Sequence, residues 1–410
     1  MATFAHFSDV HIGVWRDPKL RDISTRAFSQ AVDRCIAEKV DFVLIAGDLF
    51  NTAIPSMDLL KHAVTKIKDL KDAGISVYVV PGSHDFSASG KTMLDVLEEA
   101  GLITNVCKGK VIDGQLHLTF TTDQKTGIKL TGMLGRKGQL EHAYYESLHR
   151  DTLEQEPGEK IFLFHSGIQE LKPGDLAEME ATPLSLLPKG FNYYAAGHIH
   201  YVFQKEILEY GPICYPGALF PCNFKELEQF GRGGFYLVRD WNITWIPVQL
   251  YSVFPLRIDA DKKSPAAVKD DILDQLKGKE FLSTIVLIRI EGKLASGKPS
   301  DIDFPQVLQH CYDHGAYTVL RNTVKLTAEG FEEIKLERQS VEELEADLIQ
   351  QHLQQIKVDG LDAAAEAALM KNLLSVLDLE KAEGERVIEF EERVRKAAAQ
   401  VLELDPNTYK

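Results

Sequence analysis

The sequence predicts an α/β protein in which two β-sheets pack together between flanking helices, followed by a smaller α+β cap domain and a C-terminal helical tail. In the first half, short β-rich runs alternate with amphipathic helical segments, which is the pattern of layered α/β architecture. At 410 residues the chain is too long for one ordinary core. We therefore expect three parts: residues 1–253, residues 254–338 and residues 339–410.

The first part supplies its strands and helices in a regular order. Residues 3–8 are expected to form a strand, and apolar residues recur at helical spacing over residues 24–38. A buried strand is expected at residues 41–48, and a second helix from Met57 to Leu70 ends near Gly74. Further strands are expected at residues 75–82, 128–134, 160–166, 191–197, 233–240 and 242–250.

The remainder of the chain changes in character after Phe254. Helical patterns at residues 268–278 and 304–315 enclose a strand at residues 283–292. Ser340 and Glu343 then form a capping-box pattern, and helical stretches are expected at residues 363–377 and 381–402. These last helices are too short and too charged to form a domain, so we expect them to pack either on another chain or back on their own protein.

Composition limits the classes of function that fit. The formal charge of −15 argues against a chain that binds nucleic acid over its whole surface, so any DNA contact is expected to be local or metal-assisted. Residues 340–410 contain sixteen acidic and eight basic residues, and they carry about half of this negative charge. The five cysteines form no C-x-x-C pair, and no apolar run has the length of a membrane span. We expect reduced thiols, no membrane contact and a cytoplasmic location.

Five short segments place Asp and His residues directly after expected strands, where open α/β sheets form their ligand sites. In chain order these segments are Asp9-Val10-His11, Gly47-Asp48, Gly82-Ser83-His84-Asp85, His165-Ser166-Gly167 and Gly197-His198-Ile199-His200. A single segment of this kind is more often a capped turn, a surface pair or a satisfied core histidine. Their joint order, each after an apolar run, instead predicts one shared site.

The residue types in these segments indicate the kind of site. Carboxylates mixed with imidazoles suit octahedral first-row ions such as manganese or iron, whereas structural zinc would call for thiolates. Two ions are expected, because one Asp that bridges both can generate a nucleophilic hydroxide and shield phosphate charge. Glycines beside the ligands allow sharp backbone turns and close approach of a phosphate.

These residues resemble the calcineurin-like metallophosphoesterase superfamily, whose pattern is D-x-H, G-D, G-N-H-D/E, H and G-H-x-H. The match spans roughly Thr3 to Val248. The G-D-L-F segment from Gly47 to Phe50, the Tyr215-Pro216-Gly217 segment and the parts that follow are similar to SbcD and its archaeal and eukaryotic relatives, called meiotic recombination eleven in eukaryotes. The resemblance implies the four-layer metallophosphoesterase fold and a nuclease subunit of a DNA double-strand-break repair complex.

The resemblance also implies a set of metal ligands. Asp9, His11 and His200 would bind one ion, His165 and His198 would bind the other, and Asp48 would bridge them. The family's Asn ligand of the second ion is replaced here by Ser83, whose hydroxyl is a poorer donor and reaches less far. We predict a weaker second metal site, with a water that fills the gap as the alternative.

His84 matches the family histidine that faces the scissile phosphate, where it would stabilise the transition state or protonate the leaving oxygen. Asp85 is expected to orient His84. Asn51 stands where relatives often carry a histidine, which leaves open the exonuclease contribution of that position. The expected reaction is in-line hydrolysis of a DNA phosphodiester with two divalent ions, most consistent with Mn²⁺.

The resemblance further implies protein partners. A homodimer would form through the segments Met57 to Leu70 and Lys91 to Ala100, although ordinary core packing explains their apolar residues equally well. The tail would bind the coiled coil of an ABC-type ATPase through Leu344, Leu348, Leu353, Leu373, Leu374 and Leu377. Two other functions fit the same motifs: a phosphodiesterase of nucleotides or small phosphoesters, and a non-catalytic scaffold.

Overall fold

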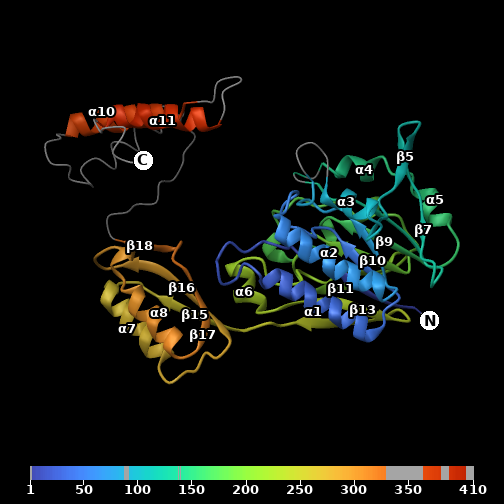
Figure 1. Cartoon of the computed structure of the whole chain (residues 1–410), viewed down its shortest axis with the longest axis horizontal. Coiled ribbons are helices and arrows are strands. Elements are labelled where there is room, and N and C mark those ends of the chain that lie inside the picture. The colour runs from blue at the N-terminus through green and yellow to red at the C-terminus, as the bar shows by residue number, and fades with distance from the viewer. Residues whose placement is uncertain are drawn as a thin grey trace. The chain divides into compact units, whose positions relative to one another are not determined.

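The structure, a computed structural model, describes residues 2–86, 92–136, 138, 140–328, 363–379 and 387–402. The chain divides into two compact units, residues 1–330 and residues 331–410. The first unit contains all of the described strands, and the described part of the second consists of two helices (Figure 1). Each unit is described separately.

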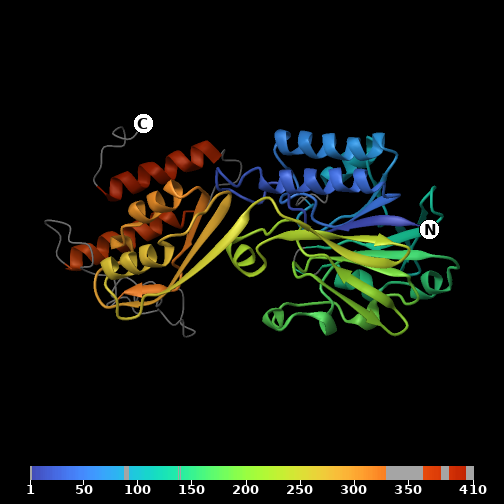
Figure 2. The same cartoon turned by 90° about the horizontal axis from the view of Figure 1, so that it is seen from below.

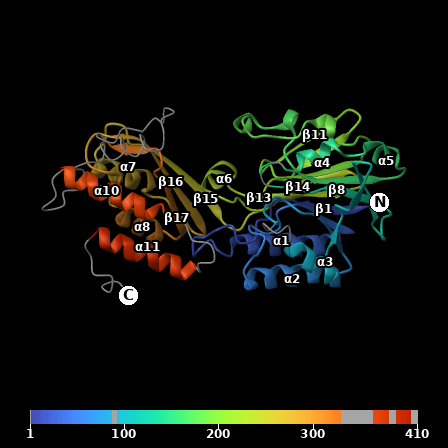
Figure 3. The same cartoon turned by 90° about the horizontal axis from the view of Figure 1, so that it is seen from above.

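The first sheet has a parallel centre. Its strand β1 pairs in parallel with β2 and antiparallel with β13, and β2 to β4 continue in parallel. In spatial order its six strands are β14 (Asn242–Val248), β13 (Gly233–Arg239), β1 (Thr3–Phe7), β2 (Phe42–Ala46), β3 (Ser76–Val80) and β4 (Thr104–Asn105). The helices α1 (Ile23–Glu38), α2 (Met57–Asp72) and α3 (Met93–Glu99) lie on the outer side of this sheet (Figures 2 and 3).

The second sheet also has six strands, and its central strands β8, β9, β10 and β12 are parallel. In spatial order it contains β11 (Phe203–Ile207), β12 (Gly211–Tyr215), β10 (Tyr193–Gly197), β9 (Lys160–His165), β8 (Lys129–Met133) and β7 (Thr121–Thr122). The short helices α4 (His142–Glu146) and α5 (Arg150–Gln155) contribute Tyr145 and Leu153 to the core on its outer face. A separate hairpin pairs β5 (Gly109–Ile112) with β6 (Gln115–Leu118).

Alternation of side chains along the strands builds the sandwich. In β2, Phe42 and Leu44 enter the core between the two sheets, whereas Val43 and Ile45 pack under the helices. In β9, Ile161 enters the core between the sheets, and Phe162 faces the opposite side. Because side chains alternate with a period of two, each central strand contributes to two cores. The result is four layers: helices, sheet, sheet and a second outer layer.

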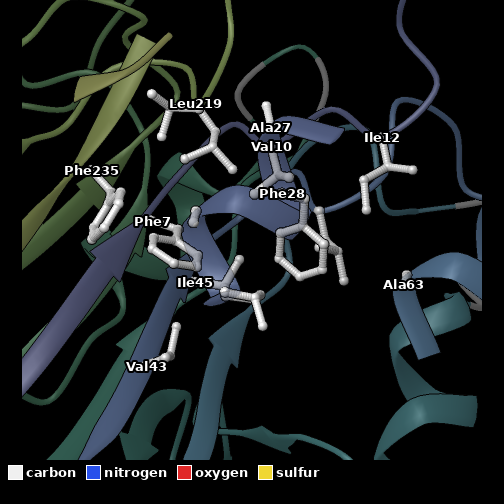
Figure 4. Close-up of a cluster of buried hydrophobic side chains, with 14 of the residues drawn as sticks. Phe7, Val10, Ile12, Ala27, Phe28, Val43, Ile45, Ala63, Leu219 and Phe235 are labelled. Atoms are coloured by element: carbon white, nitrogen blue, oxygen red, sulfur yellow. The ribbon is translucent and has the colours of Figure 1, made fainter. Parts of the chain in front are cut away.

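The core beneath α1 also anchors the loops after the strands. Figure 4 shows Phe7 of β1 beside Phe235 of β13, with Ala27 and Phe28 of α1 close by. The rings of Phe7 and Phe235 meet edge to face at 4.9 Å. Val10 and Ile12, which alternate with Asp9 and His11, are buried in the same cluster. This packing fixes the loop that follows β1.

A third sheet forms the smaller α+β part of the first unit. Its strands β15, β16 and β17 pair in parallel, and β18 pairs with β16. The elements are β15 (Ser252–Asp259), α7 (Pro265–Leu276), β16 (Thr284–Leu294), α8 (Phe304–Asp313), β17 (Ala316–Asn322) and β18 (Leu326–Ala328). Both helices contribute buried residues to the core of this sheet. The predicted domain boundaries at residues 253 and 338 stay predictions.

The predicted fold class is confirmed: a two-sheet sandwich with flanking helices precedes a smaller α+β part. The second unit contains α10 (Ala363–Leu377) and α11 (Val387–Val401), whereas the helix expected from Ser340 and the start expected at Lys381 lie outside the described residues. All five cysteines are free thiols. None of the described helices is both long enough and apolar enough to cross a membrane.

Candidate metal centre

Three of the predicted segments follow β1, β2 and β3, and the other two begin at the last residue of β9, His165, and at the last residue of β10, Gly197. Within each sheet these strands are parallel neighbours, so their carboxyl ends lie along one edge. Contacts between side chains and backbone join the two edges. The amide of His198 lies 3.1 Å from both carboxylate oxygens of Asp9, and Nδ1 of His165 lies 2.8 Å from the carbonyl oxygen of Ala46. The structure therefore brings the segments together.

The backbone at this edge is held in an unusual conformation. Asp9, His11, Asp48 and His198 have φ angles of 49°, 44°, 53° and 86°, in the left-handed region. Each such residue costs on the order of 1–3 kcal/mol and persists only where the surroundings over-determine it. The loops after β1 and β2 hold each other in this conformation, because the amide of His11 donates to the carbonyl of Asp48 at 3.0 Å. Such strain is typical of functional sites.

Asp48 lies between two groups of imidazoles. Its Oδ2 atom is 3.2 Å from Nε2 of His165 and 3.7 Å from Nε2 of His11. Its other oxygen, Oδ1, accepts a hydrogen bond of 2.7 Å from the amide of His84. The carboxylate is 2% exposed and therefore has a fixed orientation. One carboxylate thus reaches ligand atoms on both sides of the site.

Asp9 and its partners form the adjoining group. Oδ1 of Asp9 is 3.5 Å from Nε2 of His200 and 3.9 Å from Nε2 of His11. The two imidazole Nε2 atoms are themselves 3.3 Å apart. The side chain of Asp9 is completely buried. Three potential ligand atoms therefore converge on a small volume.

His198 and Ser83 complete the predicted ligand set. The ring of His198 meets the ring of His165 edge to face at 5.2 Å. Ser83 is 7% exposed and lies in the loop after β3, between Gly82 and His84. The loop is tied to the centre on both sides of Ser83, because the amide of Gly82 binds Asp85 and the amide of His84 binds Asp48.

The expected role of Asp85 requires a correction. Its carboxylate accepts hydrogen bonds from the backbone amides of Asp48, Phe50 and Gly82, at 3.0, 3.3 and 2.9 Å. Nδ1 of His84 instead lies 2.8 Å from the carbonyl oxygen of Asn51. Since a carbonyl only accepts, Nδ1 carries the proton, and Nε2 has no hydrogen-bond partner among the described residues. Asp85 therefore fixes the loops after β2 and β3, and Asn51 orients His84 through its backbone.

The charges of the centre fit divalent cations. Burial lowers the pKa of His11 and that of His198 to about 4, so both imidazoles are neutral donors near pH 7. Burial alone would also lower the pKa of His165, but the carboxylate of Asp48 outweighs it and raises that pKa to about 10. In the same way Asp9 outweighs burial and raises the pKa of His200. A cation bound between these pairs would replace the protons on His165 and His200.

Unsatisfied atoms and tight glycines support the same assignment. Nε2 of His165 is buried and makes no hydrogen bond of good geometry with any described residue. A Cβ atom added to Gly82 would lie 2.2 Å from Oδ1 of Asp48, and one added to Gly47 would lie 2.1 Å from Nδ1 of His165. Only glycine therefore allows these loops to approach the ligands so closely. The donor set and its spacing fit a cluster of divalent metal ions.

Sequence reasoning missed two residues beside His200. Oε1 of Glu226 lies 3.0 Å from Nδ1 of His200, which leaves Nε2 of that ring directed at Asp9. The thiol of Cys222 also has its sulfur within 4.8 Å of ligand atoms of His11 and His200. Glu226 belongs to α6 (Phe224–Phe230). Asn223 caps this helix, and its side-chain nitrogen donates to the carboxylate of Glu226. The only available signal was the Asn-x-x-Glu pattern, which reads as an ordinary helix start.

Comparison with known proteins agrees with the fold. A family model described as calcineurin-like phosphoesterase matches residues 2–202. Residues 2–202 therefore belong to this family, whose members use divalent metals. Within the family the chain is an SbcD- and Mre11-like protein.

Three relatives illustrate the similarity, and each is named DNA double-strand break repair protein Mre11. The protein from Saccharolobus solfataricus is 28% identical over 313 residues, which cover 72% of this chain and 76% of that protein. The Archaeoglobus fulgidus protein is 25% identical over 361 residues, with coverages of 82% and 77%. The Sulfurisphaera tokodaii protein is 32% identical over 201 residues, with coverages of 48% and 48%.

Proposed function

We propose that this protein is a manganese-dependent DNA nuclease, with exonuclease and endonuclease activity, that serves as a subunit of a double-strand-break repair complex. The observation that carries the proposal is the position of Asp48, whose Oδ2 atom lies 3.7 Å from His11 and 3.2 Å from His165. A carboxylate between two sets of donors is what a two-metal phosphoesterase requires. The repair role is supported by relatives that are named DNA double-strand break repair proteins.

The ligand roles follow from this arrangement. Asp9, His11 and His200 would hold one ion, Ser83, His165 and His198 would contribute to the second, and Asp48 would contact both. Neutral imidazoles with carboxylates suit manganese better than calcium or structural zinc. When bound, the two ions would acidify a water molecule and shield the charge of the phosphate. Asp85 supports this centre by holding the amides of Asp48 and Gly82 in place.

His84 is the group best suited to move a proton. The carbonyl of Asn51 holds Nδ1, so that only Nε2 is available to a substrate. The ring stands at 88° to the ring of His11, with 4.9 Å between their centroids, at the edge of the cluster. A protonated Nε2 would donate to the phosphate or to the leaving oxygen. Because the partner of Nδ1 is a backbone carbonyl, the missing histidine at position 51 does not change this role.

Protein partners are part of the proposal. Met57 of α2 and Val96 of α3 are 77% and 56% exposed, which supports a homodimer surface on these helices. In α10, Leu374 and Leu377 are 39% and 62% exposed, which supports contact with the coiled coil of an ABC-type ATPase. Leu373 of the same helix is described and partly buried, whereas the three remaining candidate contacts, Leu344, Leu348 and Leu353, lie outside the described residues. Exposed leucines on a helix face are typical of helix-in-groove recognition.

The proposal is tested by comparing two substrates. Purified protein is incubated with linear duplex DNA and separately with a small bis-ester of phosphate, each with Mn²⁺, with Mg²⁺ and with a chelator. The expected result is Mn²⁺-dependent degradation of the DNA, lost in the chelator. Hydrolysis of the bis-ester without DNA degradation would instead identify a small-molecule phosphodiesterase. No hydrolysis of either substrate by a protein that binds Mn²⁺ would identify a scaffold.

A further inference from the structure

A cavity of about 320 Å³ opens beside the metal centre, with His198 and His200 on its wall. Most of the lining surface is apolar. Besides the two histidines, the lining residues are Leu176, Met179, Tyr201 and Phe230, together with Asn223, Lys225, Glu226 and Gln229. The aliphatic and aromatic side chains among them lie on the segment that contains η3 (Gly174–Leu176), after β10 and on α6. The cavity therefore joins two of the candidate metal ligands to an aromatic and aliphatic surface.

The aromatic wall is fixed by contacts within the protein. The rings of Tyr201 and Phe230 meet edge to face at 5.0 Å. The hydroxyl of Tyr201 donates to the carboxylate of Asp175 and accepts from Nε2 of Gln229 at 3.0 Å. Nζ of Lys225 lies 3.6 Å from the same carboxylate, which ties α6 to the η3 segment. A wall formed before a ligand arrives reduces the ordering cost of binding.

Another part of the cavity wall is anchored close to the end of β9, the strand that carries His165. The amide of Thr182 donates to the carbonyl of Gly167 at 2.8 Å, and the amide of Gln169 donates to the carbonyl of Thr182 at 2.9 Å. Met179 packs on Gly167, because a Cβ atom there would lie 2.7 Å from Cε of Met179. The thioether thus lies over a residue only two positions from a candidate ligand.

We propose that this cavity binds the nucleobase of the nucleotide whose phosphate lies at the metal centre. This inference rests on the proposed nuclease function. It adds that the base of the substrate nucleotide is bound beside the metal ions. A phosphate and a deoxyribose are polar or hydroxylated, whereas the face of a base binds favourably by stacking on aromatic and apolar side chains. A Met beside two aromatic rings forms an adaptable surface for such a face.

The subsite tolerates all four bases. The amide of Asn223 is used by α6, since its oxygen accepts from the amide of Glu226 and its nitrogen donates to the Glu226 side chain. Glu226 in turn binds His200. The two other polar residues of the lining also have partners, since Lys225 pairs with Asp175 and Gln229 donates to the hydroxyl of Tyr201, so binding is expected to depend mainly on stacking. A base that enters the cavity must leave its helical stack, which costs least at frayed ends and in single strands. The subsite therefore favours those substrates over the interior of a duplex.

The test compares a dinucleotide that carries both bases with its abasic counterpart, in which one base is replaced by hydrogen. With Mn²⁺, Phe230→Ala and Met179→Ala are each expected to lower kcat/KM about tenfold on the first substrate and less than about twofold on the second. Leu208→Ala, at a side chain that is 89% exposed outside the cavity, is the matched control. An equal loss on both substrates, or no loss on either, overturns the proposal.

A binding measurement separates this proposal from the proposed function. Calorimetry with Mn²⁺ compares deoxyadenosine 5′-monophosphate with 2-deoxyribose 5-phosphate. Wild type should bind the nucleotide about tenfold more tightly, and Phe230→Ala should remove this difference without a change in Mn²⁺ binding. Equal affinity of wild type for the two ligands contradicts the base subsite. Absence of DNA hydrolysis by wild type contradicts the nuclease function instead, whatever the binding result.

Discussion

Oε1 of Glu226 lies 3.0 Å from Nδ1 of His200 and holds that imidazole with Nε2 facing Asp9. The same oxygen accepts a hydrogen bond from Nδ2 of Asn223, and the other oxygen accepts one of 2.8 Å from the amide of Cys222. Glu226 therefore uses both oxygens as acceptors. A carboxylate behind a ligating histidine fixes its tautomer and raises its basicity.

Glu226→Gln is expected to weaken Mn²⁺ binding roughly 10- to 100-fold. Glutamine has one acceptor oxygen, so either His200 or the amide of Cys222 must lose its partner, and the negative charge is lost in both cases. Calorimetric titration with Mn²⁺ measures the change. Glu206→Gln, at an exposed residue of β11, serves as the control. An unchanged dissociation constant in Glu226→Gln would show that the contact between Glu226 and His200 does not support metal binding and that Glu226 only stabilises the start of α6.

His84→Ala is expected to lower kcat on linear DNA roughly 10²- to 10⁴-fold while both metal ions stay bound. The reason is that the carbonyl of Asn51 orients the ring through Nδ1 and that His84 is not among the proposed metal ligands. Single-turnover rates and metal content, measured by atomic emission on the same samples, check the two halves of the prediction. Loss of metal from the variant would mean that His84 is a ligand and not a proton donor.

The sequence was sufficient to predict which residues meet, because β1, β2 and β3 are parallel neighbours and a motif after each strand must reach the same edge. It was not sufficient to predict what holds those residues in place. Glu226 lies 26 positions beyond His200, and Asn51 acts through a backbone carbonyl that no side-chain pattern reveals. Asp85 was misassigned for the same reason, since its partners are three backbone amides.

Gly82→Ala is expected to disrupt the metal centre. Its added Cβ atom would lie 2.2 Å from Oδ1 of Asp48, so either the carboxylate or the loop must move. We expect Mn²⁺ affinity to fall by at least about tenfold, because Asp48 would no longer reach both groups of ligands. Gly174→Ala is the matched control, since a Cβ atom there meets nothing within 4 Å and its φ is not positive. Equal Mn²⁺ affinity in the two variants would contradict the close approach.

Ser83→Asn is expected to increase occupancy of the second metal ion. The amide oxygen of asparagine is a better donor than a hydroxyl and extends further from the backbone. Metal stoichiometry, titrated at limiting Mn²⁺ in the native protein and in the variant, measures this change. Ser83→Ala is the companion variant and should bind no more metal than the native protein. Equal two-ion occupancy in the native protein and Ser83→Asn would mean that a water already completes the site.

Glu228 connects α6 to the third sheet, and its contribution to stability is expected to depend on pH. Oε2 of Glu228 lies 2.9 Å from Nη2 of Arg289, and Oε1 lies 3.1 Å from Nε of Arg257. Burial alone would raise the pKa of Glu228, but hydrogen bonds and charge from Arg289 outweigh it and hold that pKa below its ordinary value of 4.5.

Because the folded state prefers the charged form, the stabilisation is fully present above the unfolded pKa and is lost as pH falls through the folded pKa. Glu228→Gln should therefore cost about 2 kcal/mol near pH 7, since it removes hydrogen bonds to a charged partner that is largely buried. The difference in Tm from wild type should stay constant down to about pH 5 and shrink below about pH 4.5. Glu99→Gln, at an exposed residue of α3, should show no difference at any pH. A Glu228→Gln difference that grows towards low pH would mean that burial, and not Arg289, dominates at this carboxylate.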